Sequence, residues 1–179
     1  MKVALIRHPK PLIAPGICYG RLDIPVDPAA AGDIDAIATD SGLRGAEKVW
    51  TSPARRCRQL ADAIAMALDA PLSIDARLQE LDFGDWEGLS WEAVPRAELD
   101  RWAASPLTFT PPRGESGAAL LARVRDFETV LRRDRQDCVV VSHGGPLKLL
   151  NALLNERAVD LLASTPPFGR INHVDCRPM

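Results

Sequence analysis

Short apolar runs alternate with amphipathic stretches along the chain. The apolar runs lie at residues 3–6, 48–51, 72–75, 138–141 and 171–176. A continuous apolar run of this length is typical of a strand that is buried on both faces. The helical patterns lie at residues 28–41, from 52 to about 68, after 90, at 116–133 and at 145–154. Strands that alternate with helices predict an α/β fold, with a mostly parallel open sheet between two helix layers, a three-layer α/β/α arrangement.

The second helical pattern has a clear start signal. Ser52 stands where an N-cap residue is expected, and Pro53 suits the first helical position. We therefore expect this helix to begin at Ser52–Pro53. The proline-rich stretch 105–114 reads as a loop inside the domain, and 179 residues with 46% hydrophobic content suit one domain over residues 1–179.

Composition narrows the classes of partner. The formal net charge is −2 and the calculated pI is about 5.9, so no basic field points to nucleic acid or to an anionic membrane. No apolar run approaches the ~20 residues that span a bilayer, and the N-terminal run is too short for a signal peptide. The four cysteines form no Cys-x-x-Cys pair, which favours a reduced, cytoplasmic protein.

Charged and reactive residues follow the apolar runs. Arg7 and His8 end the first run, Arg56 comes one turn after the second, Glu80 follows the third, and His143 follows the fourth. Ligands of open α/β sheets bind at the carboxyl ends of the strands, so these five side chains should converge on one edge. Each of them alone has an ordinary interpretation, as a turn histidine, a solvated arginine or a surface acid. Their equivalent positions favour a shared site.

Two neighbouring arginines have to be told apart. Residues three and four apart share one face of a helix. Arg56 lines up with apolar positions such as Leu60 and Ile64, whereas Arg55 lines up with polar ones. Arg56 is therefore the arginine expected to face the sheet.

Four motifs together resemble those of the histidine phosphatase superfamily, the phosphoglycerate mutase-like group. They are Arg7-His8-Pro9, SPARR at 52–56, ELDFGDWEG at 80–88 and SHGG at 142–145. The resemblance spans nearly the whole chain in the expected order. The stretches CYGRLD and SPARRCRQLA are similar to the α-ribazole phosphatase branch, which serves cobalamin biosynthesis.

The resemblance implies a metal-independent phosphatase that works without a cofactor through a phosphohistidine. His8 would be the nucleophile, and Glu80 would protonate the leaving group and then activate water. The phosphoryl group would be held by Arg7, Arg56, His143 and the backbone N–H of Gly144. The substrate would be a small phosphorylated metabolite, with α-ribazole 5′-phosphate as the named candidate. A phosphoglycerate mutase-type transfer and a non-catalytic phospho-ligand binder stay open as alternatives.

Several positions depart from the family pattern or stand near its variable loops. Pro9 replaces the usual glycine, and we expect its carbonyl to hold the non-attacking N–H of His8. The expected substrate contacts are Arg21, Trp91, Arg113 and Ser116. The expected structural residues are His173 on the last strand and, for packing, Phe83 and Trp86. Apolar helix faces suit a core and a dimer interface equally well, so the oligomeric state stays open.

Overall fold

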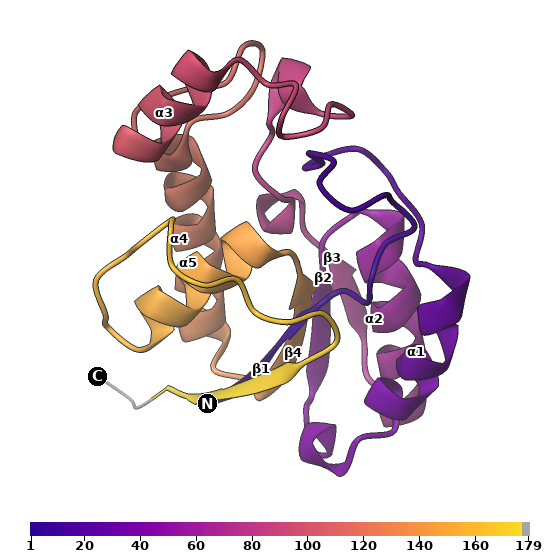
Figure 1. Cartoon of the computed structure of the whole chain (residues 1–179). Helices are drawn as coiled ribbons and strands as arrows, with labels where there is room; N and C mark the ends of the chain where they lie inside the picture. The colour runs from indigo at the N-terminus through magenta and orange to yellow at the C-terminus, as the bar shows by residue number, and fades with distance from the viewer. Residues whose placement is uncertain (177–179) are drawn as a thin grey trace.

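A five-stranded sheet in the order β3-β2-β4-β1-β5 forms the centre of the computed structural model, which describes residues 1–176 (Figure 1). The strands are β1 (Lys2–Arg7), β2 (Lys48–Thr51), β3 (Leu72–Ile74), β4 (Cys138–Ser142) and β5 (Ile171–Asp175). The first four are parallel to one another, and β5 runs antiparallel to β1. The predicted strands and the mostly parallel sheet are confirmed, and each predicted boundary is within one residue.

Helices cover both faces of the sheet. The helices are α1 (Ala31–Ala38), α2 (Arg55–Leu68), α3 (Arg96–Ala104), α4 (Gly117–Asp134) and α5 (Gly144–Leu154). Short 3-10 turns are η1 (Pro28–Ala30), η2 (Ser41–Leu43), η3 (Ala76–Leu78) and η4 (Gly84–Trp86). Successive side chains of a strand point to opposite faces, so Leu5 packs with α4 and α5 while Ile6 packs with α1 and α2. The predicted three-layer α/β/α architecture is confirmed.

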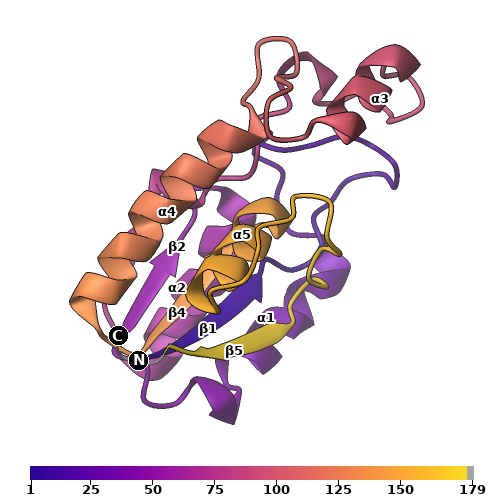
Figure 2. The same cartoon turned by 90° about the vertical axis from the view of Figure 1, so that its left-hand side faces the viewer.

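A small aromatic cluster extends the fold beyond the sheet. Trp86 is 2% exposed and packs with neighbours that include Phe83, Trp91 and Phe109. Helix α3 belongs to this cluster and lies beyond one end of the long helix α4 (Figure 2). The proline-rich stretch 105–114 is a loop between these two helices, as expected.

The predicted start of α2 is wrong. The helix begins at Arg55, with Ala54 in an extended conformation at the N-cap position. Ser52 is buried, and its hydroxyl lies 2.8 Å from His143 Nε2. The hydroxyl also accepts from the Ala54 N–H at 3.4 Å, so Ser52 makes a local turn contact and a long-range contact before the helix begins. The helix predicted at 28–41 is also shorter, because a 3-10 turn precedes α1 and Asp40 caps the separate turn η2.

The four cysteines, Cys18, Cys57, Cys138 and Cys176, are all free and buried. Within residues 1–176, no helix has the length and apolar character needed to cross a membrane.

Candidate active site

The sheet order brings the polar ends of three strands together. Strand β4 lies between β1 and β2, and its Ser142 pairs with Arg7. The residues that follow these strands, His8, Ser52 and His143, therefore meet at one edge. Glu80 reaches the same edge from the irregular segment after η3.

His8 is held as a neutral imidazole. Its ring is 1% exposed, and its Nδ1 lies 2.7 Å from the carbonyl oxygen of Pro9. A carbonyl only accepts, so Nδ1 carries the proton and Nε2 keeps its lone pair. Burial first, and then the charge of Arg56, lowers the pKa of His8 to about 3. The expected contact of the Pro9 carbonyl with His8 is confirmed, and Nε2 is the ring nitrogen that has an unprotonated lone pair.

Arg56 connects most of the site. Its side chain is fully buried, and its Nε donates to His8 Nε2 over 3.3 Å. One terminal nitrogen donates to the carbonyl of Leu22 at 2.7 Å. The other reaches the Gly20 carbonyl at 2.7 Å and His143 Nδ1 at 3.2 Å. Arg55 is exposed, so the prediction that Arg56 is the inward-facing arginine is confirmed.

His143 is the second buried imidazole. A guanidinium only donates, so His143 Nδ1 accepts from Arg56 and Nε2 carries the proton toward Ser52 Oγ. Burial, followed by the neighbouring His8 and Arg56, holds its pKa well below the usual value. The neutral His143 ring therefore has one donor, its Nε2–H, and uptake of a proton at Nδ1, which a nearby anion would favour, would give it a second.

Arg7 has one buried N–H group, at Nε, for which the described residues supply no acceptor. Its guanidinium carbon lies 3.8 Å from the centre of the Phe168 ring, and one terminal nitrogen donates to the Pro166 carbonyl at 3.0 Å. The buried Nε–H needs an acceptor, and a phosphoryl oxygen would supply one.

Glu80 is oriented by the first turn of α5. The backbone N–H of Gly145 lies 3.1 and 3.2 Å from the two carboxylate oxygens of Glu80. A helix N-terminus stabilises a carboxylate at this position. Within residues 1–176, no group of three or more His, Cys, Asp or Glu side chains is placed to hold a metal ion.

Two cavities open beside Glu80. The larger, about 340 Å³, is polar where Arg7, Glu80 and Gly144 line it. Its aromatic wall consists of Tyr19, Phe83, Trp91 and Trp102. The smaller, about 210 Å³, is lined by residues that include Arg21, Glu80 and His143. His8 and Arg56 line neither cavity; they are fully covered by their neighbours.

The expected substrate contacts divide into two groups. Trp91 and Gly144 line the larger cavity, and Arg21 lines the smaller one. Arg113 and Ser116 line neither cavity. The Arg113 side chain is 84% exposed and pairs with Asp85, while Ser116 caps α4 by accepting from the Ala119 N–H.

The sequence interpretation missed several cavity residues. Phe83 was expected only to pack; it does pack on Trp91, but it also lines the larger cavity. Tyr19, Trp102 and Lys148 were not expected there. The signal was the clustering of aromatic residues, because three of the chain's four tryptophans fall within residues 86–102. His173 lies on β5 and is exposed, away from the site.

A neutral buried histidine between two arginines, with a carboxylate nearby, defines a phosphatase-type site. The family model of the histidine phosphatase superfamily (branch 1) matches residues 3–173, and the chain belongs to this superfamily. It is 29% identical over 160 residues to phosphoserine phosphatase 1 of Hydrogenobacter thermophilus, covering 86% of this chain and 76% of that protein. It is 28% identical over 160 residues to the adenosylcobalamin/α-ribazole phosphatase of Salmonella typhimurium, covering 86% and 79%.

The fold is shared with solved structures. The α-ribazole phosphatase of Shigella flexneri superposes with a TM-score of 0.88 at 24% identity, covering 98% of this chain and 90% of that one. At this identity the likeness establishes the fold. The relatives carry different substrate names, so the family alone does not select a substrate.

Proposed function

We propose that this protein hydrolyses phosphomonoesters through a phosphohistidine formed on His8 Nε2. The observation that carries the proposal is the state of His8: its proton is fixed on Nδ1 by the Pro9 carbonyl, and burial keeps the ring neutral. A nucleophilic nitrogen needs this form at neutral pH.

In the first step, Nε2 of His8 attacks phosphorus and the bond to the leaving oxygen breaks. Glu80 enters this step as the protonated acid, gives its proton to that oxygen and is left as a carboxylate. In the second step, Glu80 takes a proton from water, the water oxygen attacks phosphorus, and the N–P bond breaks to release inorganic phosphate. Arg7 and Arg56 stabilise the charge on the three phosphoryl oxygens, a role that placed guanidinium donors fill without a metal ion.

For the substrate, we propose α-ribazole 5′-phosphate, an intermediate of cobalamin biosynthesis. The support is the aromatic wall of the larger cavity beside Glu80, which suits a leaving group that carries a flat ring. The Salmonella enzyme, 28% identical, is named for this substrate, but phosphoserine phosphatase 1 is 29% identical, so the aromatic wall and not the identity carries this choice. A cytoplasmic location remains a prediction that the four free cysteines support.

The decisive experiment is hydrolysis of p-nitrophenyl phosphate in excess EDTA by wild type, His8→Gln and His173→Gln. We expect metal-independent turnover, a loss on the order of 10³-fold or more in His8→Gln, and an unchanged rate in His173→Gln. Undiminished turnover in His8→Gln would refute the proposal. Rapid quench should trap phosphate on histidine; binding of vanadate without such trapping would favour the non-catalytic binder, and dependence on a bisphosphorylated primer would favour the mutase.

The substrate is tested by a screen of phosphorylated metabolites that includes α-ribazole 5′-phosphate and phosphoserine. We expect the largest kcat/KM for α-ribazole 5′-phosphate. A clear preference for phosphoserine would overturn the substrate proposal and leave the phosphatase mechanism in place.

A further inference from the structure

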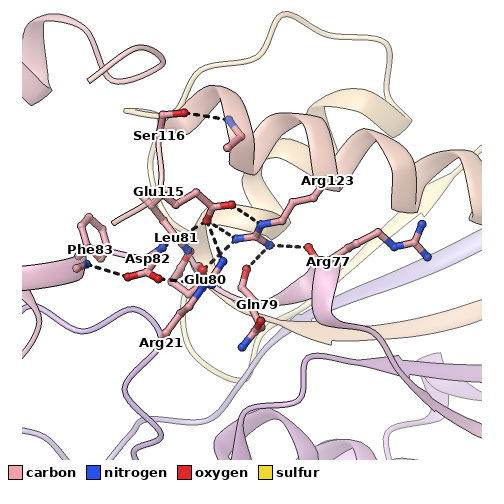
Figure 3. A network of polar contacts seen from close by, with 12 residues as sticks. Arg21, Arg77, Gln79, Glu80, Leu81, Asp82, Phe83, Glu115, Ser116 and Arg123 are labelled. Carbon is pink, nitrogen blue, oxygen red and sulfur yellow. Dashed lines mark hydrogen bonds and ion pairs between the residues drawn. The ribbon is translucent and has the colours of Figure 1, made fainter. Parts of the chain in front are cut away.

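Every hydrogen-bond donor of the Arg123 side chain has a partner, either the carboxylate of Glu115 or one of three backbone carbonyls. It lies on α4, and its side chain is only 15% exposed. Its Nε and one terminal nitrogen hold the two carboxylate oxygens of Glu115 at 2.8 and 2.9 Å. The remaining three donors go to backbone carbonyls, of Arg77 and Gln79 at 2.6 Å each and of Glu80 at 3.0 Å (Figure 3). A guanidinium has five N–H groups, so none is left over.

The carbonyls that Arg123 holds belong to the segment that carries Glu80. After η3, residues 79–83 form no helix or strand, so no regular ladder fixes the backbone there. The segment is anchored from the sheet by Ser142 Oγ, which donates to the Leu78 carbonyl at 2.6 Å. Arg123 supplies the matching anchor from the helix layer, at Glu80 itself.

Glu115 extends this anchor to the other side of Glu80. Its carboxylate accepts from the backbone N–H of Asp82 at 3.4 Å, and its own N–H donates to the Asp82 carbonyl at 2.9 Å. It also pairs with Arg21 at 3.4 Å (Figure 3). Burial alone would raise the pKa of Glu115, but the hydrogen bonds and charges of Arg123 and Arg21 bring it below its usual value. Glu115 is therefore an anion in a fixed position, and its two carboxylate oxygens hold the guanidinium of Arg123 in place.

We propose that Arg123, held in place by Glu115, is a positioning residue for Glu80. It fixes the backbone on both sides of Glu80, so that the carboxylate stays on the Gly145 N–H and beside the larger cavity. This inference rests on the proposed function, in which Glu80 protonates the leaving oxygen. Removal of Arg123 should therefore weaken proton transfer to that oxygen and leave the attack by His8 intact.

The test compares kcat/KM for two substrates whose leaving groups differ in their need for a proton. An alkyl phosphate needs a proton on its leaving oxygen, whereas p-nitrophenolate leaves without one. In Arg123→Met we expect kcat/KM to fall on the order of 10²-fold for an alkyl ester and by less than about tenfold for p-nitrophenyl phosphate. The comparison uses kcat/KM, because this quantity is not affected by the later attack of water on the phosphohistidine.

Arg132→Met is the matched control. Arg132 lies on the same helix, pairs with Glu128, and donates to the carbonyl of Leu153. It has the same kind of contacts as Arg123, but neither partner belongs to the segment that carries Glu80, so its loss should change neither ester by more than about twofold. If Arg123→Met does not fold by circular dichroism, Arg123→Lys is measured in the same way, and it should show the same selective loss with a smaller amplitude.

An equal loss on both esters in the folded Arg123 variant would overturn the inference, and so would a selective loss in Arg132→Met. Both outcomes leave the proposed function standing. If wild type hydrolyses neither ester, the proposed function itself fails, so the two failures are distinguishable.

Discussion

Keeping His8 neutral inside the protein should make stability depend on pH. Burial, followed by the charge of Arg56, holds the pKa of His8 at about 3, against about 6.5 in an unfolded chain. Between these values the unfolded chain binds a proton that the folded protein does not, so the free energy of unfolding falls as pH falls below 6.5. From pH 8 to pH 5, His8 alone should cost about 2 kcal/mol. His143 acts in the same direction, because its pKa is also lowered.

The assay is urea unfolding of wild type and His8→Gln at pH 8, 7, 6 and 5. Glutamine keeps a polar side chain but does not titrate, and the carboxylates contribute equally to both proteins. The stability difference between the two should therefore change by about 2 kcal/mol over this range, with wild type losing more. Parallel curves would refute the reasoning. So would a His8 ring that titrates near pH 6.5 by NMR, where a chain with three histidines gives a simple spectrum.

Three further predictions concern single side chains. Pro9→Gly should keep the residue-9 carbonyl on His8 Nδ1 and change kcat by less than about tenfold. It should lower the free energy of unfolding by about 0.4–1 kcal/mol. A gain of several orders of magnitude in kcat would mean that the proline disables the site. Arg56→Lys should lower kcat/KM on the order of 10²-fold, because lysine cannot reach both imidazoles and two carbonyls, while Arg55→Lys should be neutral. Trp91→Leu should raise KM for α-ribazole 5′-phosphate by about 2- to 10-fold and leave KM for phosphoserine unchanged. Equal effects on the two KM values would show that the aromatic wall does not recognise the ring of the substrate.

The sequence was sufficient wherever one local pattern controls the structure. Strand β4 is a continuous apolar run, buried along its whole length, and its end therefore locates His143. Arg56 follows from helical periodicity alone, because the apolar face that includes Leu60 must pack on the sheet. These two arguments place His143 and Arg56 at the edge of the sheet without any long-range information.

Long-range contacts account for what the sequence did not predict. Ser52 has the local signature of an N-cap, but its hydroxyl bonds a histidine 91 residues away. Arg123 is one of 18 arginines, and nothing near it in the chain shows that it holds carbonyls more than 40 residues away. Arg113 stands in a loop expected to cover the site, yet its contact with Asp85 keeps it in solvent. In each case the deciding partner is distant in sequence.

The charges of the site explain why a phosphate group would complete it. Arg7 and Arg56 bring two positive charges to a buried edge, and Glu80 lines the same cavity as Arg7. Their field helps to keep both histidines neutral, and Arg7 Nε is left with no acceptor among the described residues. A phosphoryl dianion supplies the missing charge and acceptors, and its presence raises the proton affinity of the imidazoles. The same arrangement that lowers stability at acidic pH therefore keeps His8 in the neutral form that the proposed attack requires, a balance typical of functional sites.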